Sequence, residues 1–128
     1  MNKPVFDLEE RLVGFSVMIL TLAESLPERL GSKNLVSQLI RSGTSPTLNY
    51  GEAQSAESSK DFLHKLRVCL KELRETQICL KIVKNKKYLD PYHIDPVLHE
   101  CSELVAIFTA SIETKKRNMR EERVKGKM

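Results

Sequence analysis

The sequence predicts an all-α protein, an antiparallel up-down-up-down four-helix bundle with a kinked second helix. Four segments carry apolar residues at alternating spacings of four and three, which places them on one face of a helix. Val, Ile and Thr form no alternating runs, and the chain has only five Gly and five Pro, which argues against a β domain. The connections between the segments are short, as in antiparallel bundles, and 128 residues suit one compact unit.

The first helix is expected over residues 7–25, with Asp7 as its N-cap and Glu10 completing a capping box. It carries a second apolar strip beside its main seam, which is more apolar surface than one partner helix covers. Homo-oligomerisation through this surplus is the physical inference. The seam consists of Leu8, Leu12, Phe15, Ile19, Leu22 and Leu26, and the second strip of Val13, Val17 and Leu20.

The second helix is expected to begin after Ser32, acting as N-cap, and to run to Ala56. Its middle is small and polar, and Pro46 is expected to kink or locally break it. The run RSGTSP at residues 41–46 also suggests a phosphate-binding loop, but it lacks the GxxxxGK pattern and a preceding strand.

The third helix is expected to start after Ser58 or Ser59 and to run to Lys84. The fourth is expected to start at Asp95-Pro96, an N-cap followed by proline at the first helical position. Its apolar pattern stops after Ile112, so the sequence predicts a bundle over residues 1–114 and a basic, frayed tail over residues 115–128.

Charge is distributed unevenly along the chain. Residues 60–87 carry nine bases and three acids, residues 88–114 carry five acids and no Lys or Arg, and residues 115–128 carry seven bases and two acids. One interpretation is that the basic and acidic segments form surface ion pairs that stabilise little individually. The other is that the two basic segments attract phosphate.

Catalytic and metal-binding patterns are not found in the sequence. The three His are scattered without an HxxxH or ExxH pair, and the three Cys form no CxxC pair and are expected as reduced thiols. We therefore expect no enzyme, no metal, no cofactor and no small-molecule substrate. Neither a membrane span nor a secretory signal is expected, and the expected location is the cytoplasm.

A set of polar residues on the second and third helices is the remaining candidate for either a structural network or a ligand site. As a structural network, Glu72 or Glu75 would bond Arg41 across the two helices, and Asn49 would satisfy backbone groups freed near Pro46. As a site, the same residues would bind a ligand at the kink. The full set is Arg41, Asn49, Glu52, Glu72, Arg74 and Glu75.

A set of short polar and apolar pieces falls in order along three of the expected helices. They are Arg41-Ser42-Gly43-Thr44-Ser45, Asn49-Tyr50, Glu52-Ala53, Asp61-Phe62, His64-Lys65-Leu66, Leu70-Lys71-Glu72, Arg74-Glu75-Thr76 and Thr109-Ala110-Ser111-Ile112. Through these pieces, residues 6–114 resemble the four helix bundle family named after proteins encoded in 23S rRNA intervening sequences, with departures from the family pattern at Pro46 and Gly51. The resemblance implies a closed bundle assembled as a five-fold ring, without an established biochemical activity. A similar bundle, the accessory variability protein of diversity-generating retroelements, is a basic pentamer that works with nucleic acid.

Two functions follow from these patterns. The first is an oligomer that binds nucleic acid, RNA in particular or else DNA, by contacting phosphates without reading sequence. The alternative is a protein-interaction or scaffold bundle without a nucleic-acid role. The candidate phosphate-binding residues are Lys65, Lys71, Lys81, Lys84, Lys86, Lys87, Lys115, Lys116 and Arg117.

Overall fold

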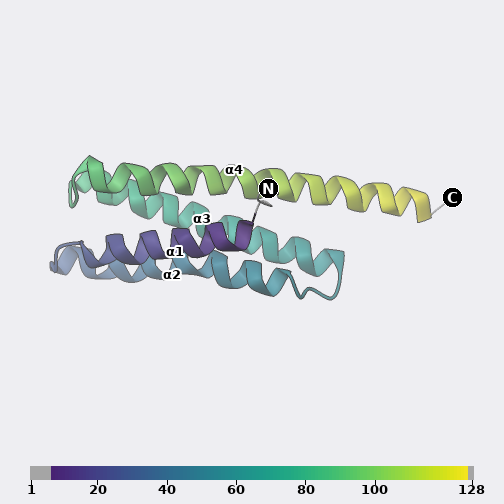
Figure 1. The fold of residues 1–128 in the computed structure, drawn as a ribbon, viewed down its shortest axis with the longest axis horizontal. Helices are drawn as coiled ribbons and strands as arrows, with labels where there is room; N and C mark the ends of the chain where they lie inside the picture. Colours follow the sequence, from purple (N-terminus) through teal and green to yellow (C-terminus); the bar gives the residue numbers. More distant parts are fainter. Residues whose placement is uncertain (1–6, 127–128) are drawn as a thin grey trace, which may run out of the picture.

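The computed structural model describes residues 7–126, and within this range the chain is all-helical. Its helices are α1 (Leu8–Glu24), α2 (Leu30–Ala53), α3 (Ser59–Lys86) and α4 (Pro91–Gly126). Successive helices run in opposite directions in Figure 1. Within the described residues α1 packs on α2 and α4, α3 packs on the same two helices, and the backbones of α1 and α3 do not approach each other closely. The predicted all-α four-helix fold is confirmed.

Two of the helix starts lie where the sequence places them. The Asp7 carboxylate accepts the Glu10 N–H at 3.1 Å, and the Ser58 hydroxyl accepts the Asp61 N–H at 3.0 Å. Each side chain satisfies one of the backbone donors that the first helical turn leaves without a partner. The boundaries of α1 and α3 are therefore set by local capping chemistry.

The expected start of α2 is wrong. The helix begins at Leu30 with Arg29 as N-cap, so Ser32 lies inside its first turn. The Ser32 hydroxyl accepts the Arg29 N–H at 3.2 Å, and its proton faces the Pro27 carbonyl at 2.5 Å and the Arg29 carbonyl at 2.9 Å. Ser32 thus fixes the connection after Pro27 from within the helix, and α2 ends at Ala53 rather than Ala56.

The expected start of α4 is also wrong, because the helix begins five residues earlier, at Pro91 instead of Pro96. The chain contains two Asp-Pro pairs, and the first of them begins the helix. The Asp90 carboxylate accepts the Tyr92 N–H at 2.9 Å, and Pro91 occupies the first helical position. Pro96 lies inside the helix, and Asp95 instead accepts a hydrogen bond from Lys84 at 2.7 Å.

The expected frayed tail is also corrected. α4 continues as helix through residues 115–126 and extends past the ends of the other three helices (Figure 1). The basic residues of this segment are therefore held in helical register. Residues 1–6 of the expected bundle and 127–128 of the expected tail lie outside the described residues.

α2 remains helical across Pro46, so no local break occurs there; the kink remains a prediction. Just before this proline, α2 packs closely against α1. A Cβ built on Gly43 would lie 2.7 Å from Ile19 Cγ2, so only glycine fits at this contact. The Ser16 hydroxyl lies 2.6 Å from the Thr47 hydroxyl, and Thr47 donates to the Leu12 carbonyl at 3.0 Å.

The apolar seams predicted from spacing form one continuous core. It includes the fully buried Phe15, Leu73 and Phe108. Cys69 and Cys101 are buried free thiols that donate to backbone carbonyls, at 3.4 Å and 3.3 Å. The second strip of α1 has no partner helix in the described chain, and Val13, Val17 and Leu20 are 41%, 56% and 41% exposed.

Candidate nucleic-acid interface and the polar cluster between α2 and α3

The polar cluster between α2 and α3 is centred on Arg41. Its Nη1 lies 2.8 Å from Glu72 Oε2, and its Nη2 lies 2.6 Å from Glu75 Oε2. Nη2 also donates to the side-chain oxygen of Gln38 at 2.9 Å. The two carboxylates lie one helical turn apart on α3, which lets one planar guanidinium bind both.

Burial within this cluster is unequal. The Glu72 side chain is 12% exposed, while that of Arg41 is 51% exposed. The hydrogen bond to Glu75, followed by the charge of Glu72, raises the pKa of Arg41, so the guanidinium stays charged. Both terminal nitrogens of Arg41 are engaged within the protein, and this arrangement suits a structural link between α2 and α3.

The other predicted members of the network lie elsewhere. Pro46 leaves the carbonyl of Ser42 without its helical donor. The Asn49 amide donates to the Ser45 carbonyl at 3.0 Å and to the Ser45 hydroxyl at 2.9 Å, directly before Pro46, so its bonds stay within α2 and do not join the Arg41 cluster. The Ser42 hydroxyl lies 2.9 Å from the buried Thr76 hydroxyl.

Two further charged residues of the set are separate from Arg41. Glu52 pairs with Lys65 at 3.2 Å near the end of α2. Arg74 is exposed on α3 and makes no ion pair within residues 7–126. The predicted set of six therefore divides into one compact cluster and three separate residues.

The candidate phosphate-binding lysines of α3 are spread along the helix. At a rise of about 1.5 Å per residue, Lys65 and Lys86 are separated by about 30 Å along the axis. Lys65 is paired with Glu52, and Lys84 with Asp95 at 2.7 Å. The remaining candidates on or directly after α3 are exposed: Lys71, Lys81, Lys86 and Lys87.

The candidates on α4 lie close together at the other end of the bundle from Lys86. Lys115 lies over the Phe62 ring, with Nζ 5.4 Å from the ring centroid, and Lys116 lies 3.5 Å from Glu113. Arg117 is exposed. Lys115 therefore still packs against α3, and α4 continues from here past the ends of the other helices (Figure 1).

Three further bases of α4 follow the named candidates: Arg120, Arg123 and Lys125. Arg120 and Arg123 follow Lys116 at spacings of four and three, which puts the three side chains on one helix face. We call Lys116, Arg120 and Arg123 the basic face of α4. The signal was present in the sequence as this spacing, but it has meaning only where the chain is helical.

Two other kinds of feature bear on function, a metal site and a membrane span. Within residues 7–126, no group of three or more His, Cys, Asp or Glu side chains is arranged to hold a metal ion. None of the helices in this range is both long enough and apolar enough to cross a membrane.

The fold and this surface define a class: an all-α four-helix bundle whose last helix carries a basic face beyond the bundle. Residues 8–110 match the family described as 23S rRNA-intervening sequence protein, and the chain belongs to this family. No curated protein matches the chain in sequence.

A solved structure gives a second comparison. It is the crystal structure of a protein of unknown function from the S23 ribosomal protein family of Bacteroides thetaiotaomicron. The two chains are 27% identical, the TM-score is 0.77, and the match covers 83% of this chain and 98% of that one. The family match ends at residue 110, so the basic face of α4 lies beyond it.

Proposed function

We propose that this protein is a cytoplasmic, non-enzymatic, homo-oligomeric bundle that binds nucleic acid, RNA in particular. The observation that carries the proposal is the basic face of α4. Residues 115–126 contain six bases and two acids on a continuous helix. The free cysteines at positions 69, 79 and 101 support a reducing compartment.

The arrangement of charge on α4 suits phosphate contacts. Lys116, Arg120 and Arg123 are successive neighbours on one helix face, whereas Glu121 and Glu122 lie off that face. Basic side chains that project from a helix beyond the bundle reach a polyanion without a clash with the body of the protein. Such contacts bind phosphate irrespective of base sequence and weaken with salt.

Self-association is proposed from apolar strips on opposite sides of the bundle. The α1 strip consists of Val13, Val17 and Leu20, and exposed Ile78 and Ile82 form a second strip on α3. Because the backbones of α1 and α3 are not neighbours within the described bundle, the two strips face different directions. Two different patches on one chain favour head-to-tail contact, which gives a ring where the rotation between neighbouring copies closes. The five-membered ring implied by the family resemblance is such an assembly, and it would multiply weak α4 contacts.

RNA binding is tested with a labelled RNA hairpin and a DNA duplex of the same length, titrated at low and physiological salt. The Lys116→Gln/Arg120→Gln/Arg123→Gln variant is expected to bind more weakly and to lower the salt slope by about two to three. The matched control is Lys81→Gln/Lys86→Gln/Lys87→Gln, which removes the same charge from the far end of α3. Equal binding by all three proteins would contradict the assignment to α4.

Self-association is tested by analytical ultracentrifugation of a Val17→Glu variant, which places a charge in the α1 strip. We expect a smaller assembly with an unchanged helical content, because Val17 is exposed in the single chain. Leu48→Glu is the control, since Leu48 is an apolar residue on α2, 68% exposed and outside both strips. An unchanged mass for Val17→Glu would rule out the α1 strip as an interface.

A scaffold that binds only protein is the second candidate function. It is favoured by the pairing of Lys65 with Glu52 and of Lys84 with Asp95, which reduces the free charge on α3. Absence of RNA and DNA binding at low salt would support this function over the first.

A further inference from the structure

A cavity lies at the level where α1 begins. α1 starts at Leu8, whereas α4 and the turn between α2 and α3 continue farther in the same direction (Figure 1). Within residues 7–126, α2, α3 and α4 therefore surround a space of about 360 Å³ that Leu8 closes on one side. This volume is at the lower end of the range for small-ligand pockets.

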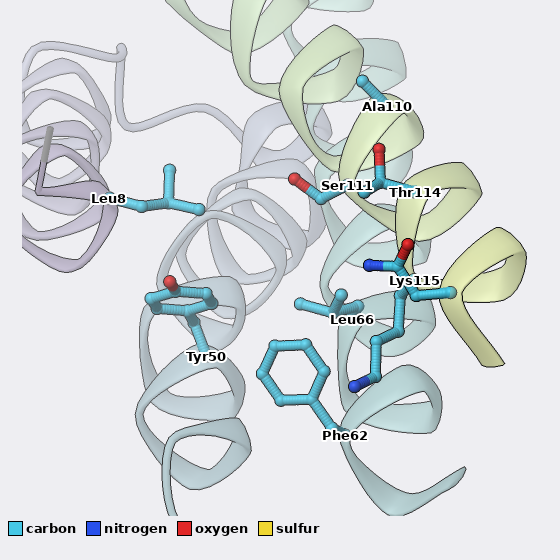
Figure 2. A pocket seen from close by; sticks show the side chains of 9 residues that line it. Leu8, Tyr50, Phe62, Leu66, Ala110, Ser111, Thr114 and Lys115 are labelled. Atoms are coloured by element: carbon cyan, nitrogen blue, oxygen red, sulfur yellow. The ribbon is translucent and has the colours of Figure 1, made fainter. Parts of the chain in front are cut away.

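One wall of the cavity is an aromatic ring. Phe62 and Leu66 of α3 point into the space in Figure 2, and Phe62 is only half-buried. The Lys115 ammonium lies 5.4 Å from the centre of the Phe62 ring. This cation–π contact is a modest one, so a flat ligand able to cover the ring can displace the lysine from it.

The remaining wall offers neutral hydrogen-bonding groups. Tyr50, Ser111 and Thr114, which carry hydroxyls, and Asn118, which carries an amide, are among the residues that line the cavity. None of the residues that line the cavity carries a carboxylate, and Lys115 provides a positive charge. A fitting ligand has a flat apolar face, a polar edge and an attached negative charge.

We propose that this cavity binds one unpaired nucleobase, stacked on Phe62, with the adjoining phosphate held by Lys115. The inference rests on the proposed function, because Lys116 and the rest of the basic face follow directly on α4 and would contact the neighbouring phosphates. A base has the flat face, polar edge and phosphate that the cavity can bind. The volume admits one heterocycle and excludes a paired duplex, so the cavity selects single-stranded nucleic acid.

The first test uses the full chain with two small probes, uridine monophosphate and ribose 5-phosphate. They carry the same phosphate, and only the first carries a base. NMR titration is expected to shift the signals of Phe62, Leu66 and Ser111 clearly more with the nucleotide than with the sugar phosphate, which reaches only Lys115. Equal shifts with both probes would leave an anion site only and overturn the base assignment, without affecting the proposed function.

The second test measures binding of a single-stranded RNA and of a duplex of equal length. Phe62→Leu keeps apolar volume and removes the ring, so single-strand affinity is expected to fall about 5- to 150-fold, the range of base–aromatic stacking. Duplex affinity is expected to stay within about twofold, because the phosphate contacts remain. The second variant, Lys115→Gln, removes the charge that would hold the adjoining phosphate. Lys81→Gln is its control, because it removes the same charge from a lysine far from the cavity. Thermal unfolding confirms that each variant is folded.

The outcomes separate the two proposals. Loss of single-strand preference in Phe62→Leu and Lys115→Gln supports the cavity, while an unchanged preference in both overturns it and leaves the α4 interface in place. If the wild-type protein binds neither RNA form, the proposed function fails. Nucleotide-specific NMR shifts in that case would still support a base-binding cavity.

Discussion

The contact between α1 and α2 at Gly43 makes a sharp prediction about stability. In a Gly43→Ala variant the new Cβ would lie 2.7 Å and 2.8 Å from the two γ-carbons of Ile19 and 3.1 Å from its Cβ. Carbon atoms in contact settle at about 3.5–4.0 Å, so the helices must separate by roughly 1 Å. Ile19 is fully buried and β-branched, and it therefore cannot turn aside.

The size of the effect follows from competing contributions. Overpacking of a close contact costs about 1–3 kcal/mol. Separation of the helices also lengthens the Ser16–Thr47 bond of 2.6 Å and the bond of 3.0 Å from Thr47 to the Leu12 carbonyl, each worth about 1 kcal/mol. Alanine recovers about 1 kcal/mol of helix propensity. The expected result is a net loss of about 1–3 kcal/mol in the free energy of unfolding.

Urea unfolding at one fixed protein concentration measures this loss. Gly14→Ala and Gly51→Ala are matched controls, because a Cβ built at either helical position meets nothing within 4 Å. They are expected to gain about 0.5–1 kcal/mol. If Gly43→Ala is as stable as these controls, α1 does not pack closely on α2 at Gly43.

Three further predictions concern stability. Lys87 ends α3 with a left-handed φ of 62°, a conformation that glycine adopts without strain. Lys87→Gly is therefore expected to raise the free energy of unfolding by about 1 kcal/mol in thermal unfolding. Lys87→Gln is the control, because it loses the same charge but keeps the Cβ, and it is not expected to raise stability. Glu72→Ala is expected to lower the free energy of unfolding by about 1–3 kcal/mol, because it removes the nearly buried partner of Arg41, and to leave RNA affinity unchanged; lost binding with an unchanged melting temperature would instead identify a ligand site. Burial raises the pKa of Cys69 and Cys101 to about 12, above the value of the unfolded thiol, so their contribution is complete below about pH 8.5 and is lost as the pH rises towards 12. Urea unfolding of Cys69→Ala/Cys101→Ala is expected to show a shallower loss of stability between pH 9 and 12, and a slope parallel to the wild type would contradict this cause.

Local signals in the sequence were sufficient for part of the fold. The spacing of four and three defined the buried seams, and Asp7 marked the start of a helix by its capping chemistry. Two Asp-Pro pairs carried the same signal for α4, and the sequence alone did not show that the first of them starts the helix. Which of the two Asp-Pro pairs starts α4 depends on which apolar residues after them find a partner helix. That choice is made by the packing of the whole bundle.

For the candidate site, too, the sequence indicated some contacts and only the packed bundle decided the others. The sequence suggested that Arg41 would meet Glu72 or Glu75, because opposite charges occurred on adjacent helices; the bundle brings it to both. The α3 lysines looked like one basic segment in the sequence, but α3 distributes them along its length and pairs two of them with acids. Sequence proximity measures charge along the chain, whereas binding depends on charge across a surface.

What the sequence by itself determined was the class of structure, because helix periodicity and capping act over a few residues. It determined the family as well, because residues 8–110 carry the family pattern. Only the tertiary structure decided which apolar strip is covered, which glycine admits a neighbouring helix and where the cavity beside Phe62 opens. These features depend on the relative lengths and contacts of helices that are distant in sequence, and no local pattern specifies them.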